Sequence, residues 1–145
     1  MVFKSSIQSA ASSADINPSP ATNTGSGITA TLTAGENLTF GNVCYIKSDG
    51  KIWKGDANSA GLFPVQYMAL GTISADATGS FLILGFATLS SWTWTVGGRL
   101  YLSTTAGAMT QTQPAATDDC IQVLGVALSA TTVLFFPSPD YLTHT

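Results

Sequence analysis

Short runs of alternating apolar and polar residues, each closed by a turn sequence, fill the chain from residue 28 onward. Residues 28–33 (Ile-Thr-Ala-Thr-Leu-Thr) alternate with a period of two, as a strand with one buried face does. Asp49-Gly50 separates two such runs and predicts a hairpin with a type I′ turn, in which both turn residues have positive φ. Gly85 interrupts an apolar run, which indicates a β-bulge or a barrel corner.

The spacing of these runs predicts an all-β fold, a small β-barrel or sandwich of about eight to nine short strands. The expected strands cover residues 28–33, 43–47, 51–54, 66–73, 80–89, 99–103, 108–112, 121–128 and 132–136. Their apolar positions give the expected core: Val43, Tyr45, Ile52, Leu70, Ile73, Leu82, Leu84, Leu100, Leu102, Val123, Val126 and Val133.

A weak internal repeat runs through the same region. Residues 41–46 (Gly-Asn-Val-Cys-Tyr-Ile) are similar to residues 97–102 (Gly-Gly-Arg-Leu-Tyr-Leu), and Leu-Gly at 70–71 recurs at 124–125. Two interpretations stay open: two related halves that share one core, or a chance similarity in a β-sequence rich in Gly and Thr. Related halves favour a closed or nearly closed barrel, which removes exposed sheet edges.

The first 27 residues differ from the rest, so we expect an extended N-terminal arm at 1–27 and a single β-domain at 28–145. The arm is rich in Ser, Ala, Asn, Pro and Thr and has too little apolar area to offset its ordering entropy. Phe3, Ile7 and Ile16 are nevertheless more than a spacer requires. The arm is either a frayed end or a segment that orders on a partner surface through these three residues.

Composition argues against several classes of function. Charged residues make up only 9% of the chain, against about 25% in an average globular protein. The bases are few and scattered, which excludes a nucleic-acid partner, and no apolar run is long enough to predict a membrane span. Residues 1–6 lack the apolar core of a secretory signal, which predicts synthesis in a host cytoplasm without use of the secretory route.

The sequence contains no recognisable catalytic, cofactor or metal motif, so we expect neither an enzyme nor a cofactor. The single histidine, His144, stands next to the last residue, where a supporting second partner is rare. Cys44 and Cys120 fit no zinc or redox spacing. They are interpreted as buried free thiols, with a disulfide as the alternative.

Trp92 and Trp94 flank a single threonine, so in a strand both indoles project from the same face. Exposed together they would form a platform for stacking a sugar. Alternatively, they plug one end of the barrel or fill a subunit interface, where aromatic residues are favoured.

Several segments resemble proteins of tailed-phage virions. Residues 34–38 (Ala-Gly-Glu-Asn-Leu), 41–46, 49–54 and 68–73 follow a pattern found in phage head and structural proteins. Residues 97–107 and 122–127 are similar to segments of capsid decoration (cement) proteins and of phage fibre proteins. The resemblance covers about residues 34–137.

The resemblance implies a structural protein on the capsid surface of the virion, a homotrimer that binds the major capsid protein and stabilises contacts between capsomers. A trimer that spans several subunits would turn weak contacts into strong ones through effective concentration. The alternative is a tail or head fibre component that binds a host surface glycan through Trp92 and Trp94.

Overall fold

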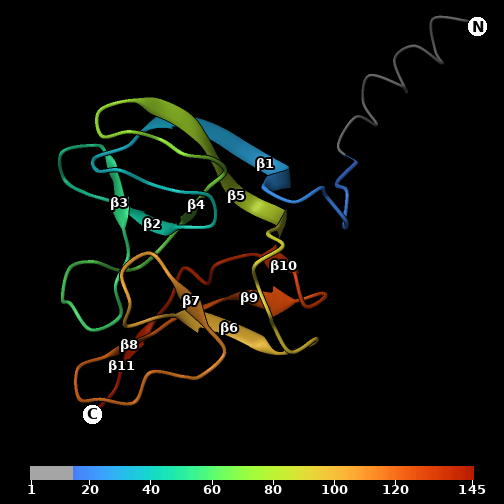
Figure 1. The fold of residues 1–145 in the computed structure, drawn as a ribbon. Helices are drawn as coiled ribbons and strands as arrows, with labels where there is room; N and C mark the ends of the chain where they lie inside the picture. The colour runs from blue at the N-terminus through green and yellow to red at the C-terminus, as the bar shows by residue number, and fades with distance from the viewer. Residues whose placement is uncertain (1–14) are drawn as a thin grey trace, which may run out of the picture.

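The computed structural model describes residues 15–145, and these contain strands, turns and loops but no helix (Figure 1). The all-β prediction is therefore confirmed. The strands are β1 (Thr24–Thr33), β2 (Val43–Ile46), β3 (Ile52–Lys54), β4 (Tyr67–Ala69), β5 (Thr78–Thr88), β6 (Arg99–Leu102), β7 (Met109–Thr110), β8 (Cys120–Ile121), β9 (Val123–Ala127), β10 (Thr132–Phe135) and β11 (Leu142–Thr143).

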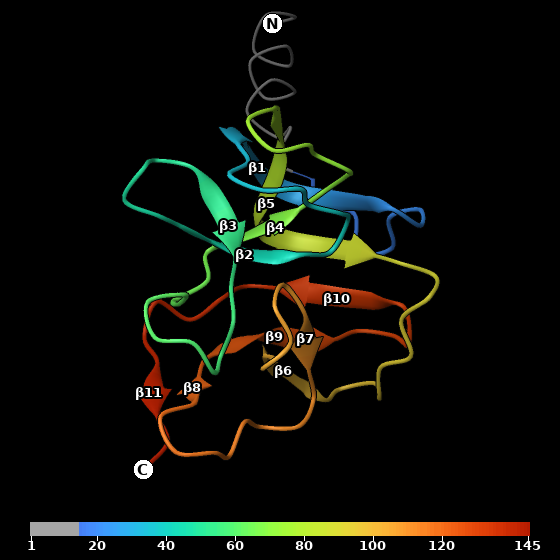
Figure 2. The same ribbon diagram turned by 60° about the vertical axis from the view of Figure 1, so that its left-hand side comes forward.

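The main sheet is antiparallel and consists of two halves with the same internal order. Its strands follow the order β3-β2-β4-β5-β10-β9-β6-β7, with β1 added along β5, while β8 and β11 form a separate pair. Read from its outer edge, the second half is β7-β6-β9-β10, which matches β3-β2-β4-β5 strand for strand. The matching order agrees with the interpretation of two related halves, and the halves stack one above the other in a curled half-barrel (Figure 2).

The two halves are joined where β5 meets β10. Thr88 pairs with Thr132 at this junction, and their buried hydroxyls are hydrogen-bonded at 2.7 Å. β1 pairs along the whole length of β5, so β4 and β10 share the opposite edge of that long strand.

The irregularity predicted at Gly85 is present as a bulge in the β1–β5 pair. The register shifts opposite residues 82–84, and Gly85 then pairs with Gly27, both with positive φ (149° and 153°). A Cβ on Gly85 would lie 2.2 Å from the Ser26 carbonyl oxygen. The two backbones can approach this closely only because both residues are glycines.

The core contains two clusters of buried side chains. One extends across both halves and includes Val43, Leu82, Leu100, Leu124 and Phe135, and the other lies within the first half around Ile52 and Phe81. Of the predicted core residues, those buried are Val43, Tyr45, Ile52, Ile73, Leu82, Leu100, Leu102 and Val133. Leu70, Val123 and Val126 are half-buried.

The prediction for Leu84 was wrong, because its side chain is 39% exposed. The period of two would place Leu84 on the same face as the buried Leu82. The bulge at Ile83 breaks this alternation, and Ile83 and Leu84 are both exposed.

The Asp49-Gly50 hairpin forms, but its turn is not type I′. Only Gly50 has a positive φ, 79°. The Gly50 N–H donates to the Lys47 carbonyl at 2.9 Å, and the Lys47 N–H donates to the Lys51 carbonyl at 3.0 Å. These bonds close a longer loop in which the glycine alone takes the left-handed conformation, another common hairpin geometry.

The boundary between arm and domain also differs from the prediction at residue 27. β1 begins at Thr24, so residues 24–27 belong to the sheet and not to the arm. Upstream, the Asn17 N–H donates to the Ser26 hydroxyl at 2.8 Å, and the Thr22 hydroxyl accepts from the Ser90 N–H at 2.9 Å. Ile16 is half-buried. Phe3 and Ile7 lie outside the described residues.

Candidate protein-binding groove

An apolar groove with a volume of about 580 Å³ lies at the junction of the two halves. Its walls come from four separate parts of the chain: the segment before β4, the middle of β5, the start of β9 and the segment after β10. The lining residues are Val65, Gln66, Ile83, Leu84, Val123, Phe136 and the Pro-Ser-Pro stretch at 137–139. None of them carries a charge.

The groove opens because two strands compete for one position on β5. β4 pairs Met68 with Leu82, and β10 pairs Phe135 with Gly85. Extending the two registers would place both Gln66 and Phe136 opposite Leu84. Only one backbone can occupy that position, and in the structure neither does, so both segments turn aside.

A buried glutamine holds the two walls in place. Gln122 is fully buried, and its side chain accepts from the Val65 N–H at 2.8 Å and donates to the Val65 carbonyl at 2.9 Å. The same amide also donates to the Ser138 carbonyl at 2.8 Å. This residue ties the first half to the C-terminal segment, so the groove is pre-formed.

Sequence analysis missed Gln122, which lies inside the apolar run 121–128. The structure divides this run into β8 and β9, with Gln122 between them. The only signal in the sequence was a polar residue between Ile121 and Val123.

Gln66, one of the lining residues, has a side-chain oxygen without a partner. Gln66 Oε1 is buried and accepts no hydrogen bond from any residue that the structure describes. A buried acceptor without a donor is costly. The apolar surface also continues past the groove, because Ile28, the partner of Leu84 in β1, is 54% exposed. A suitable ligand is uncharged and apolar.

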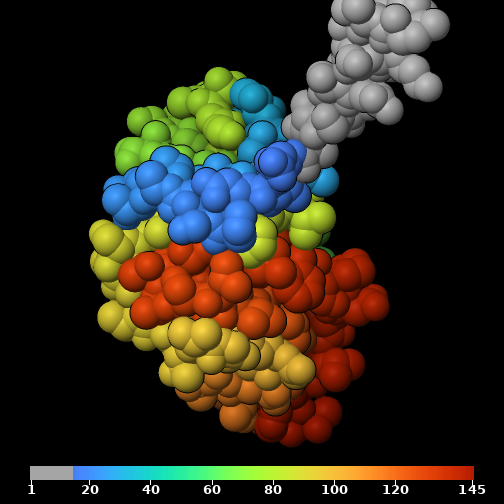
Figure 3. All heavy atoms as spheres, turned by 90° about the vertical axis from the view of Figure 1, so that its right-hand side faces the viewer, coloured from blue at the N-terminus to red at the C-terminus, as the bar shows by residue number. Residues whose placement is uncertain are grey.

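Figure 3 views the molecule from the side on which the start of the described chain lies. The start of the described chain (blue), a yellow-green part of the β5 region and the red C-terminal segment lie next to one another on one face. Segments far apart in the sequence therefore share this face.

Trp92 and Trp94 lie apart from the groove, in a second hollow of about 300 Å³ that also includes Phe40 and Asn42. The Trp92 and Trp94 ring centroids are 5.9 Å apart with planes tilted by 50°, and the Phe40 ring is 6.3 Å from Trp92. All three rings are half-buried and pack against the larger core cluster. Because of the tilt, the two indoles do not form one flat platform.

The reactive side chains are protected or dispersed. Cys44 and Cys120 are free and buried, as predicted. Burial raises the pKa of the Cys120 thiol to about 11 and that of Cys44 further still, so neither forms a thiolate near neutral pH. Within residues 15–145, no three His, Cys, Asp or Glu side chains gather as a metal site.

The described part of the chain has no helix that is both long and apolar enough to cross a membrane. In the comparisons with known proteins, no family model matches this chain and no curated protein is found as a relative.

Proposed function

We propose that this protein is a structural component of a tailed-phage virion, a capsid decoration protein that forms a homotrimer and binds the major capsid protein. The single observation that carries the proposal is the pre-formed, uncharged groove at the junction of the halves. Such a surface suits association with another protein chain, where apolar residues are buried and charged residues are depleted. The partner's identity comes from the resemblance of residues 34–137 to virion proteins.

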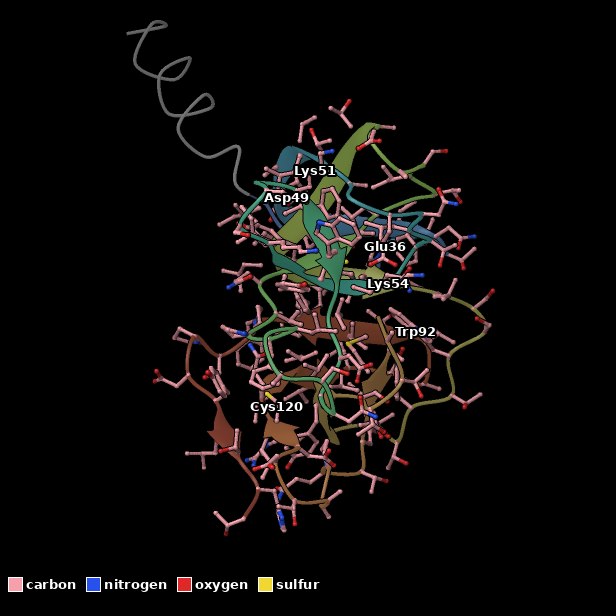
Figure 4. All side chains as sticks on the ribbon, turned by 90° about the vertical axis from the view of Figure 1, so that its left-hand side faces the viewer. Glu36, Asp49, Lys51, Lys54, Trp92 and Cys120 are labelled. Atoms are coloured by element: carbon pink, nitrogen blue, oxygen red, sulfur yellow. The ribbon has the colours of Figure 1, made fainter. Side chains whose placement is uncertain are left out.

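The low charge of the chain supports the same proposal. Charged side chains gather in the β2–β3 hairpin region, where Glu36, Asp49, Lys51 and Lys54 are visible in Figure 4. The segment from residue 97 to the C-terminus has only Arg99 and three aspartates. A surface with so little charge is suited to burial between protein subunits in a particle.

Binding to purified phage heads tests the proposal. The protein is mixed with heads that lack it, and bound copies are counted after sedimentation. We expect saturable binding with a copy number of the same order as the major capsid protein, and greater resistance of the heads to heat. No binding to heads would refute the proposal, and a few copies at the tail would favour a fibre.

The second candidate, a fibre component that binds a host glycan, rests on the hollow formed by Phe40, Trp92 and Trp94. Aromatic rings beside an amide, here Asn42, suit the apolar face and the hydroxyls of a sugar. A glycan array decides this question. Saccharide binding that is lost in Trp92→Ala and kept in Trp53→Ala would support the fibre component.

A further inference from the structure

The groove sets clear requirements for its occupant. Its walls are mostly apolar and carry no charge. The edge of β5 has no strand partner at Ile83 and Leu84 on the side facing the groove. An extended peptide with apolar side chains satisfies both requirements, because its backbone can pair with the free edge of β5 and its alternate side chains point into the groove.

The chain itself contains such a segment in residues 1–14, which lie outside the described residues. It carries one charged residue, Lys4, and large apolar residues at Val2, Phe3 and Ile7. Phe3 and Ile7 are separated by four positions, so an extended backbone would place them on the same side, about 13 Å apart. Residues 9–14 (Ser-Ala-Ala-Ser-Ser-Ala) are small and connect this segment to the domain.

The described chain begins on the correct face of the sheet. The Asn17 N–H is bonded to the Ser26 hydroxyl. Ser26 and Ile28 are two positions apart on β1, so they share a face, and Ile28 pairs with Leu84 in the groove. Ser26 and Ile28 are about 7 Å apart along the strand, so the described chain passes close to the groove at Asn17.

The length of the segment favours the groove of a second copy. Ile7 is eight residues from Asp15, an extended reach of about 26 Å, and Phe3 reaches about 40 Å. The chain's own groove is much nearer and would meet only the small residues 9–14. A domain of this size is about 35 Å across, so Phe3 and Ile7 are spaced to reach a neighbouring molecule.

We propose that the groove binds residues 1–14 of a second copy of this chain, with Phe3 and Ile7 against Leu84, Val123 and Phe136. Each copy gives its segment to the next, and the exchange closes as a ring. The closure at three copies rests on the proposed homotrimer. The contact is heterologous, so it forms a closed ring only if the rotation between copies closes.

Cysteine cross-linking between two different chains tests this contact. One full-length chain carries Ile7→Cys and the other Leu84→Cys, and the two are co-expressed and oxidised in air. A disulfide between them has to be intermolecular. The native Cys44 and Cys120 are fully buried, which keeps the background low. The matched control pairs Ile7→Cys with Val96→Cys, an exposed position away from the groove (64% exposed).

We expect a covalent dimer for the Leu84→Cys pair and none for the Val96→Cys pair. We also expect deletion of residues 1–14 to convert the oligomer into a monomer, lighter than the 15.0 kDa of the full chain, in light scattering. A chain that carries both Ile7→Cys and Leu84→Cys tests the alternative, in which residues 1–14 bind the groove of their own chain. A bond only within that chain, no bond at all, or an oligomer that survives the deletion overturns the proposal.

Head binding separates this proposal from the proposed function. If cross-linking fails while the protein still saturates phage heads, only the exchange of residues 1–14 is wrong. If cross-linking succeeds and heads are not bound, the groove contact stands and the decoration function falls.

Discussion

The two halves of the sheet share a strand order but differ in how they are stabilised. The first half has a core cluster of its own, which includes Ile52 and Phe81, in addition to its share of the larger cluster. The buried residues of the second half, such as Leu100 and Phe135, belong to the shared cluster alone. The second half therefore depends on the first for its burial, although the repeat gives both the same backbone plan.

The charged residues show the same asymmetry. The first half has two ion pairs, Lys51–Asp76 at 2.6 Å and Lys54–Glu36 at 3.8 Å. Lys47 also lies 4.4 Å from the ring of Trp53. No ion pair forms within the second half among the described residues. The two halves therefore share their strand order but differ in the charged residues on their outer surfaces.

Phe81 on β5 and Phe135 on β10 allow the largest test of this comparison, because each is a large side chain in the core of its half. Both are fully buried. Changing either to Ala should cost about 3–5 kcal/mol of unfolding free energy, measured by urea denaturation. We expect Phe135→Ala to cost more, since its cluster spans both halves, and a single transition in each variant. A larger loss for Phe81→Ala would contradict the dependence of the second half on the shared core.

Gln122→Leu should remove the hydrogen bonds that connect the loop at Val65 to the C-terminal segment at Ser138. It removes three hydrogen bonds and leaves the Val65 N–H and carbonyl without partners. We expect a loss of about 2–4 kcal/mol, since each buried unpaired group costs about 1–3 kcal/mol. The matched control is Gln111→Leu, whose amide makes two similar bonds to the Thr95 backbone nearer the surface. Equal losses in both variants would show that Gln122 has no special role.

Cys44 lies in β2 and Cys120 in β8, so the titration and the reactivity of these thiols probe the burial of each half separately. Burial raises both thiol pKa values above the ordinary value, to about 11 for Cys120. The protonated thiols therefore favour the folded state fully below about pH 9 and lose that advantage as the pH rises through the folded value. Unfolding free energy should fall between pH 9 and 11, and less so in a Cys44→Ala/Cys120→Ala variant.

The same thiols should react slowly with a disulfide reagent at pH 8, at the rate of local opening. We expect Cys120 to react before Cys44, because the second half has no cluster of its own. Single-cysteine variants assign the two rates. Faster labelling of Cys44 would reverse the order of opening that the comparison predicts.

The smallest effect is expected for the ion pairs of the first half. Lys51 and Asp76 are both solvent-exposed, and exposed pairs are screened by water and salt. Lys51→Met should leave the melting temperature unchanged within error, both at low salt and at about 1 M salt, where the Debye length is only about 3 Å. A clear loss of stability at low salt would give the charged hairpin a structural role.

The sequence by itself determined the fold class, most of the strands and most of the core. Residues such as Val43, Leu82 and Leu100 stand on short apolar runs between turn sequences, and local alternation is enough to place them. The similarity of residues 41–46 and 97–102 left two related halves as one of two interpretations, and only the strand order of the structure favours it.

Only the tertiary structure decided the groove. Gln66 and Phe136 are 70 positions apart, and nothing local shows that both registers lead to Leu84. The bulge that exposes Leu84 lies beside the pair of Gly27 and Gly85, which come from strands far apart in the sequence. Gln122 acts on Val65 and Ser138 for the same reason. Strand periodicity is a local property, whereas competition between strands for one edge arises only after the sheet has assembled.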